Sequence, residues 1–273
     1  MAESRKNSEK PTAERFGETP RRRRIPILLV IAAAAAGLLA GAFLMLREGL
    51  FTGNPRLTLR RVRIRVHGTS YWRDREKELC SRVGLNPESG VNLYLIDLKS
   101  LRRSLERIPS IASAEVMRMP PDTIEVRLEE RIPRAALGNP RSPFVIDEYC
   151  VVMPRTESAG SQMRLPVVTG ISLRQLRPGT AEPRLQGAVD LIMTTLRGFP
   201  DIRILQISVA RPGFFDLRLT YRENILYHVI LPVRNSGTAF LLSALQSAII
   251  AARRRGDNRT TFDLSFAGQV IVR

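Results

Sequence analysis

The chain has 273 residues and 44% of them are hydrophobic, which is enough to bury one large core or two modest ones. It carries 43 Lys and Arg against 26 Asp and Glu, so its net charge is +17. Such a basic chain raises the question of a nucleic-acid or anionic-lipid partner, whereas two isolated cysteines exclude a cysteine-built zinc site.

The N-terminal region predicts a tail and a membrane anchor. Residues 1–24 carry eight basic and four acidic side chains and few large apolar ones, so we expect a disordered tail. Residues 25–46 contain no charge over 22 positions, the length of a bilayer-spanning helix. The apolar core of a signal peptide is shorter, about 7–15 residues, so we predict an uncleaved transmembrane helix; the run of alanines leaves cleavage as the alternative.

The charges beside this helix set its predicted orientation. The dense block Arg21–Arg24 precedes it, and the positive-inside rule therefore favours a cytoplasmic N-terminus. Residues 47–59 then form a linker outside the cytoplasm, followed by the folded part. A basic surface near a membrane fits anionic lipid or an acidic partner.

Residues 60–131 predict a first folded domain. Arginine alternates with valine and isoleucine over residues 60–66, the pattern of a half-buried strand. A helix follows, with Ser70 as its predicted N-cap, Trp72 on its buried side and Gly84 at its end.

The same domain continues with a second helix and two strands. The helix runs from Asp97 to Pro109 with an amphipathic leucine stripe. The strands, 114–119 and 123–129, flank a proline turn. The order β-α-α-β-β predicts a small α+β unit with both helices on one face of a sheet.

Acidic residues at the end of this unit do not form a catalytic pair. Glu125 and Glu129 are expected on the outer face of their strand, and Glu130 points to the opposite face from Glu129. Glu130 or Arg131 is expected to form an exposed bridge to the next domain, worth at most about 1 kcal/mol.

Residues 132–273 predict a second, β-rich domain with two helices. Its first helix carries the predicted buried stripe Leu185, Val189, Met193 and Leu196. The expected elements are a hairpin at 143–147 and 150–153, a segment at 165–170, a helix at 183–197, strands near 202–209, 214–220 and 225–231, a helix at 238–255 and a closing hairpin at 261–273.

Residues for chemistry are scarce. The two histidines, His67 and His228, lie on predicted strands, and the sequence contains no nucleotide-loop, nucleophile-elbow or zinc-protease motif. We therefore predict no catalytic, cofactor-binding or metal site. Aromatic residues make up only 6% and the arginines are spread along the chain, so we predict no nucleic-acid partner. Cys80, on a helix, and Cys150, on a strand, are expected to be free thiols, with a disulfide as the alternative.

Several motifs together resemble a known family. The chain carries Ile64-Arg65-Val66-His67-Gly68, Gly90-Val91-Asn92-Leu93 before Asp97, Ile108-Pro109-Ser110-Ile111, the spaced residues Ala114, Val116, Arg118, Pro121, Thr123 and Ile124, and Glu130-Arg131 before Pro133. This pattern is similar to the POTRA domain of bacterial envelope proteins, in the form found in the division proteins FtsQ and DivIB. Leu165–Gly170 and residues 261–273 resemble motifs of that family's second, β-rich domain.

Two positions depart from the family pattern. Ser110 stands where the family often has tryptophan, which implies that a surface aromatic is lost. Ser265 stands where the closing hairpin usually has arginine, which implies that this chain makes any partner contact of that arginine with another residue.

The resemblance implies a non-enzymatic scaffold of the division machinery. It would be a single-pass protein of the bacterial inner membrane at the septum, with its C-terminal domains outside the cytoplasm and no cofactor. Its expected partners are small coiled-coil division proteins of the FtsB and FtsL type, other division proteins and the lipid bilayer. The alternatives are a POTRA-containing component of envelope transport and, less favoured, an anchored cell-wall enzyme.

The last strand is the expected docking site. The chain ends on it without a predicted cover, so its edge could pair with a partner strand by β-augmentation. The alternative is a hairpin that only fills the core, and the run Val270-Ile271-Val272 does not distinguish the two. The candidate contact residues are Phe266, Ala267, Gly268, Gln269, Val270 and Ile271.

Overall fold

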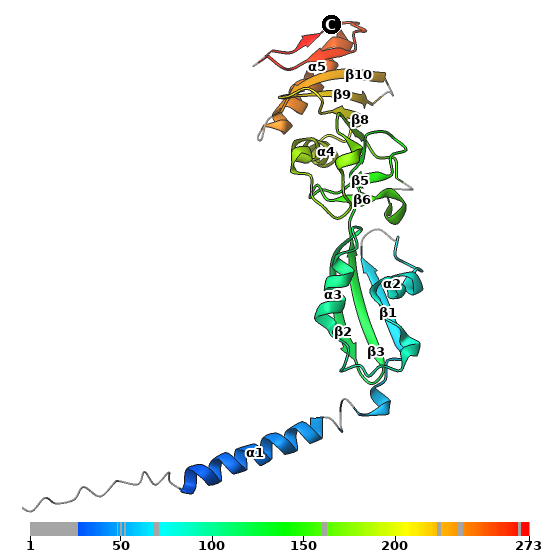
Figure 1. Ribbon diagram of the computed structural model, residues 1–273. Coiled ribbons are helices and arrows are strands. Elements are labelled where there is room, and N and C mark those ends of the chain that lie inside the picture. Colours follow the sequence, from blue (N-terminus) through cyan, green and yellow to red (C-terminus); the bar gives the residue numbers. More distant parts are fainter. Residues whose placement is uncertain are drawn as a thin grey trace, which may run out of the picture. The chain divides into compact units, whose positions relative to one another are not determined.

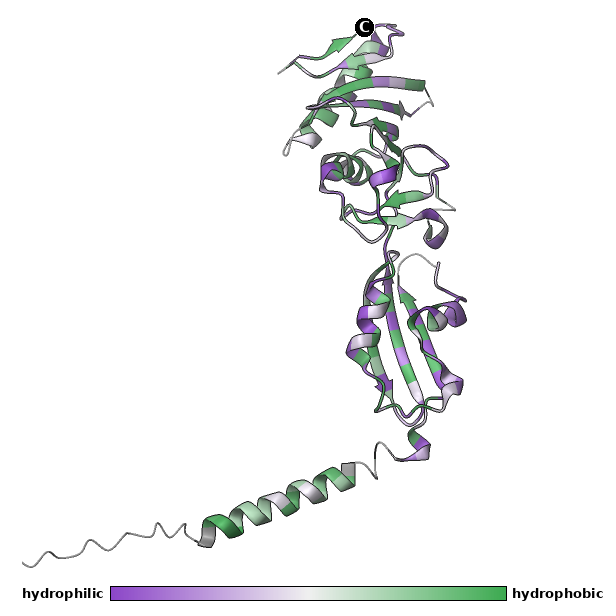
Figure 2. Cartoon of the chain, in the orientation of Figure 1, coloured by the Kyte–Doolittle hydropathy of each residue, from purple (hydrophilic) through white to green (hydrophobic). Residues whose placement is uncertain are grey.

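A computed structural model describes residues 27–47, 49, 51, 53–67, 71–159, 163–222, 225–233, 237–266 and 269–272 (Figure 1). The first unit contains helix α1, Ile27–Arg47. Hydrophobic residues follow one another along it (Figure 2), and it is the one helix of the described ranges long and apolar enough to cross a membrane.

The second unit begins with a three-stranded sheet. Its strands are β1 (Arg61–His67), β2 (Ile111–Met119) and β3 (Thr123–Glu130), in the order β1-β3-β2, with β1 parallel and β2 antiparallel to β3. Helices α2 (Glu76–Val83) and α3 (Leu98–Glu106) contribute to one core with the inner face of β3. The predicted β-α-α-β-β order and α+β class are confirmed.

The start of α2 differs from the prediction. The helix begins at Glu76, without a side-chain cap at Arg75, and the predicted cap Ser70 lies outside the described residues. Trp72 precedes the helix and is completely buried. Gly84, with φ of 71°, ends the helix as predicted, because glycine adopts this left-handed conformation without strain.

Glu125 lies on the outer face of the sheet, yet it is not exposed. Its carboxylate lies 3.5 Å from Arg65 and 3.0 Å from Arg127, and only 2% of its side chain is accessible. The predicted outer-face position of Glu125 is confirmed, and the carboxylate is nevertheless buried because these long arginine side chains lie over it.

The rest of the unit contains a nine-stranded sheet, in the order β12-β11-β10-β9-β8-β7-β4-β5-β6. Its helices are α4 (Gln186–Gly198) and α5 (Thr238–Arg254). The strands are β4 (Ala135–Leu137), β5 (Phe144–Ile146), β6 (Val152–Pro154), β7 (Val167–Thr169), β8 (Ile202–Ser208), β9 (Phe214–Tyr221), β10 (Ile225–Pro232), β11 (Thr261–Asp263) and β12 (Ile271–Val272). Short 3-10 turns are η2 (Pro55–Leu57), η3 (Pro87–Ser89), η4 (Arg155–Glu157), η6 (Leu173–Gln175) and η7 (Pro183–Leu185).

The buried stripe of α4 differs from the prediction. Leu196 is 63% exposed, whereas Ile192 is only 2% exposed. The other three residues of the stripe agree with the prediction, since Leu185 and Val189 are at most 1% exposed and Met193 packs against the core. The buried face of α4 is therefore wider than the predicted stripe and includes Ile192, while Leu196 lies outside it.

Both cysteines are free thiols. Cys80 lies on α2 as predicted. Cys150 lies in the turn between β5 and β6, not on a strand, and has φ of 60°. Its Sγ donates a hydrogen bond to Oε1 of Gln186, and burial raises the pKa of the Cys150 thiol to about 11, so the thiol stays protonated at neutral pH.

Candidate functional site

The C-terminal hairpin forms one edge of the nine-stranded sheet. β11 runs parallel to β10, with Phe262 beside Val229, and β12 runs antiparallel to β11, with Ile271 beside Asp263. Among the described strands none pairs with the outer side of β12. An edge strand presents unpaired backbone N–H and C=O groups that can accept another strand.

The candidate contact residues fall into three groups on this hairpin. Phe266 is 52% exposed and Gln269 is also exposed. Val270 packs against the hydrophobic core together with Val272, so Ile271 between them points to the opposite face. Ala267 and Gly268 lie outside the described residues.

Arg259, which the sequence did not single out, joins this edge to the preceding loop. Its Nη1 donates to the carbonyl oxygen of Val272 at 3.0 Å, and its Nη2 lies 2.6 Å from Oδ2 of Asp257. The hydrogen bonds from Arg259 lower the pKa of Asp257 from 3.8 to about 2. This hydrogen bond holds one carbonyl group of β12. It could not be predicted from sequence, because the loop with Arg259 and the strand with Val272 are neighbours only in the fold.

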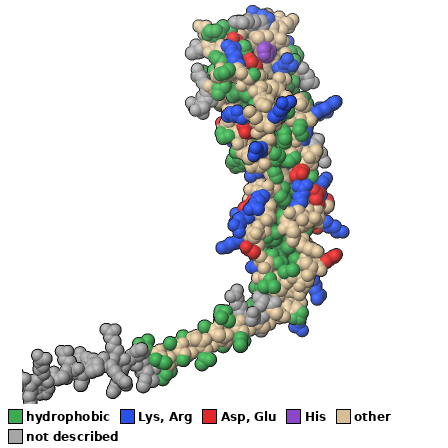
Figure 3. All heavy atoms as spheres, viewed as in Figure 1, with side chains coloured by type: hydrophobic (Ala, Val, Ile, Leu, Met, Phe, Trp, Pro, Cys, Tyr) green, Lys and Arg blue, Asp and Glu red, His purple; other side chains and the backbone are tan. Residues whose placement is uncertain are grey.

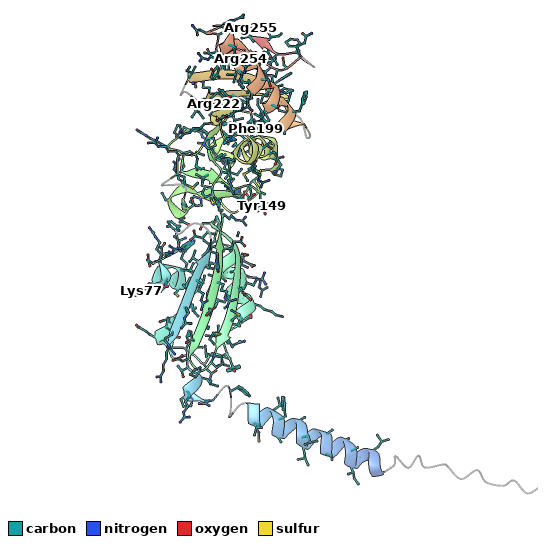
Figure 4. All side chains as sticks on the ribbon, turned by 180° about the vertical axis from the view of Figure 1, so that it is seen from behind. Lys77, Tyr149, Phe199, Arg222, Arg254 and Arg255 are labelled. Carbon is teal, nitrogen blue, oxygen red and sulfur yellow. The ribbon has the colours of Figure 1, made fainter. Side chains whose placement is uncertain are left out.

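The basic run at the end of α5 is structural in part. Nε and Nη2 of Arg253 donate hydrogen bonds to the Tyr227 hydroxyl at 3.0 and 2.9 Å. The ring of Tyr227 in turn packs against the ring of Phe262. Arg254 and Arg255 lie at the end of α5 (Figure 4). On the face seen in Figure 3, Lys and Arg side chains are scattered instead of gathered in one patch.

A buried polar cluster connects the segment before α2 to the end of β3 and to Ser110. The Glu130 carboxylate accepts hydrogen bonds from the backbone N–H groups of Tyr71 and Trp72, and the Trp72 indole N–H donates to Ser110 Oγ at 3.0 Å. Ser110 is 2% exposed. The expectation that a surface aromatic is lost at position 110 is wrong, because this position is interior and its hydroxyl satisfies the indole.

The strand exit from β3 is also more buried than expected. Arg131 Nη1 lies 2.8 Å from Oδ2 of Asp147, and these side chains are only 19% and 3% exposed. Oδ1 of Asp147 also accepts hydrogen bonds from the backbone N–H groups of Tyr149 and Val151. The bridge is therefore a partly buried, hydrogen-bonded ion pair and not the exposed pair that the sequence predicted.

The described residues offer little that resembles a binding site for a small molecule or a metal ion. An open groove of about 830 Å³ runs along α3, β2 and β3 and is lined by both signs of charge, including Lys99, Glu115 and Glu129. Ligand pockets are usually enclosed and mostly apolar. No cluster of three or more metal-ligating side chains occurs among the residues described.

Comparison with known proteins identifies the first sheet domain. Residues 63–131 match the model of the POTRA domain, FtsQ-type. The chain is 33% identical over 186 residues to the cell division protein FtsQ of Anaeromyxobacter sp. (strain K), covering 67% of this chain and 61% of the relative.

Two further relatives extend this match. The FtsQ of Myxococcus fulvus is 30% identical over 64% of this chain and 59% of the relative, and that of Geobacter sp. (strain M21) is 26% identical over 72% of this chain and 70% of the relative. The chain thus spans about three-fifths of the Anaeromyxobacter and Myxococcus proteins. By its FtsQ-type POTRA domain and these relatives, the chain belongs to the FtsQ family.

Proposed function

We propose that this protein is a cell division scaffold of the bacterial inner membrane. It crosses the membrane once through α1, with its N-terminus in the cytoplasm, and its two sheet domains bind other division proteins at the septum. The name that its relatives carry supports a role in division, and the length and apolarity of α1 support the anchor. The protein performs no chemistry of its own in this proposal.

The edge strand β12 is the proposed docking site for a small coiled-coil division protein of the FtsB or FtsL type. The observation that carries this proposal is the position of β12 at the edge of the sheet, beside the exposed Phe266. A partner strand would pair with the backbone of β12, while Phe266, Gln269 and Ile271 would contact its side chains. Ala267, Gly268 and Val270 complete the proposed contact segment.

Depletion in the native bacterium tests the division role. Loss of the protein should give long undivided cells, and a fluorescent fusion should collect at mid-cell in the inner-membrane fraction. Phe266→Glu should fail to restore division at normal protein levels, because it places a negative charge in the proposed contact segment. Tyr149→Glu is the matched control: Tyr149 is an exposed aromatic near the opposite edge of the sheet, and this variant should restore division.

Three results would contradict this proposal. Normal division after depletion would remove the division role. Recovery in the outer-membrane fraction would favour an envelope-transport component. Full rescue by Phe266→Glu would show that the edge does not need this aromatic side chain.

A further inference from the structure

An exposed apolar tip lies at one end of the three-stranded sheet domain. We define the tip as Val91, Tyr94, Leu95 and Met119, all of them exposed, with Leu95 at 65%. Figure 3 shows hydrophobic side chains gathered at this end of the domain. Isolated apolar residues on a surface are ordinary, but a group of four on neighbouring turns points to a binding surface.

Backbone hydrogen bonds place the tip beside the linker that follows α1. The N–H of Leu59 donates to the carbonyl of Val91 at 2.9 Å, and the N–H of Leu93 donates to the carbonyl of Leu57 at 2.8 Å. The turn that follows Met119 lies there too, since the N–H of Arg60 donates to the carbonyl of Asp122. The tip and the chain's entry into the domain therefore share one end.

The loop that carries Tyr94 and Leu95 is firmly held. Oδ1 of the buried Asn92 accepts the N–H of Tyr94 at 2.9 Å. Arg118 donates to the carbonyls of Leu93 and Ile96 at 2.8 and 2.6 Å, and its guanidinium lies over the Tyr94 ring. These contacts keep Leu95 on the surface, where a free loop could turn it inward.

The chemistry around the tip fits a lipid surface. Arg56 and Arg60 are exposed on the adjoining linker, and Arg61, paired with Asp122, follows them. Apolar and aromatic side chains flanked by arginine are typical of segments that lie in the membrane interface. Twelve residues separate Arg47 from Arg60 and three of them form η2, so the linker reaches less than about 45 Å from the end of α1.

We infer that the tip inserts into the headgroup region of the bilayer that α1 spans, and that Arg56 and Arg60 bind anionic headgroups there. This inference rests on the proposed membrane anchor. Docking to the bilayer would restrict the orientation of the sheet domains above the membrane, which a flexible linker alone would not do. A protein partner on the tip is the competing outcome.

Lipid quenching of a site-specific probe tests this inference. The full chain, in nanodiscs of equal parts phosphatidylcholine and phosphatidylglycerol, carries a dansyl amino acid in place of Leu95. The control carries it in place of Leu196, which is 63% exposed on α4. Spin-labelled lipid should quench the probe at 95 strongly and the probe at 196 hardly at all; the purified sample contains no other protein to bind the tip.

A third probe and a charge variant complete the design. A probe in place of Leu38 within α1 should be quenched, which establishes the anchor independently. Arg60→Gln should lower the equilibrium ratio of membrane-inserted to free tip about fivefold. Each basic residue near an anionic surface contributes about 1 kcal/mol to binding, and this energy corresponds to that factor. Far-UV circular dichroism verifies that each labelled protein is folded.

The possible results separate the two proposals. Quenching at 38 but not at 95 would overturn the tip contact and leave the anchor intact. An absence of quenching at 38 would overturn both. Quenching at 95 that does not change with Arg60→Gln or with removal of phosphatidylglycerol would refute the anionic-headgroup contact.

Discussion

At the scale of single residues, buried polar groups define the interior of the POTRA domain. Glu130 is 4% exposed and accepts two backbone N–H groups, so it fixes the chain just before α2. A buried carboxylate with such partners stabilises the fold, whereas a buried N–H group without an acceptor is costly. Glu129, its neighbour, is exposed and serves as a natural control.

Glu130→Ala should lower the free energy of unfolding by about 2–4 kcal/mol, because the N–H groups of Tyr71 and Trp72 lose their acceptor. Glu129→Ala should change it by less than about 0.5 kcal/mol. Urea denaturation of the detergent-solubilised chain can be followed by tryptophan fluorescence, since Trp72 is the single tryptophan. Equal losses in the two variants would contradict the role assigned to Glu130.

The Asp257 carboxyl should titrate well below its ordinary range. Hydrogen bonds from Arg259 lower its pKa to about 2, so its contribution to folding is present above pH 4 and is lost as the pH falls from about 4 towards 2. Carboxyl-carbon NMR between pH 3 and 5 should show a charged Asp257 in the wild type. In Arg259→Gln the pKa should return towards 3.8; an unchanged titration would refute the contact.

At the scale of elements, hydropathy periodicity predicted the strands in which apolar and polar residues alternate and missed a strand in which they do not. β1, β3 and β8 to β10 carry clear patterns and were located from sequence. β4 was missed because Ala135–Leu137 is completely buried, between β5 and β7, and therefore shows no alternation. The start of α2 was misplaced because Trp72 was assigned to a helix face, although tertiary contacts bury it.

The corrected stripe of α4 makes a direct prediction. Ile192→Ala should destabilise the protein by about 2–5 kcal/mol, since it removes a fully buried side chain. Leu196→Ala should cost less than about 0.5 kcal/mol, because Leu196 is exposed. Urea denaturation followed by far-UV circular dichroism compares them, and a larger loss for Leu196→Ala would restore the stripe first predicted from sequence.

The site was only partly accessible from sequence. Resemblance to the family placed the candidate contacts on the last hairpin, and the structure places that hairpin at the sheet edge. Consecutive valine and isoleucine residues concealed which side faces the core, and three-dimensional packing assigns Val270 and Val272 to it. Arg259 could not be found from sequence, because its contact with Val272 joins residues that are neighbours only in the folded sheet.

At the scale of the whole molecule, α1 and the sheet domains have separable tasks in the proposed function. α1 contributes an apolar surface of ordinary length for a bilayer, and the residues proposed to bind a coiled-coil partner all lie beyond residue 260. The proposed division into residues 1–24, 25–46, 47–59, 60–131 and 132–273 stays a prediction.

Replacing residues 27–46 by an unrelated apolar helix of equal length should preserve division, because the anchor's length and not its sequence is needed. The measurement is complementation of a depletion strain, with immunoblotting to verify equal abundance. A filamentous phenotype at equal abundance would show that α1 makes a specific partner contact.

In-cell photo-crosslinking from the edge of the sheet tests the central proposal most directly. A photoreactive residue at Phe266, Gln269 or Ile271 should capture a small single-pass coiled-coil protein, identified by mass spectrometry, and one at Tyr149 should not. Val270→Pro should abolish capture, because proline lacks the backbone N–H that a paired strand needs. An absence of capture from all three edge positions, with the protein folded and at mid-cell, would contradict docking at β12.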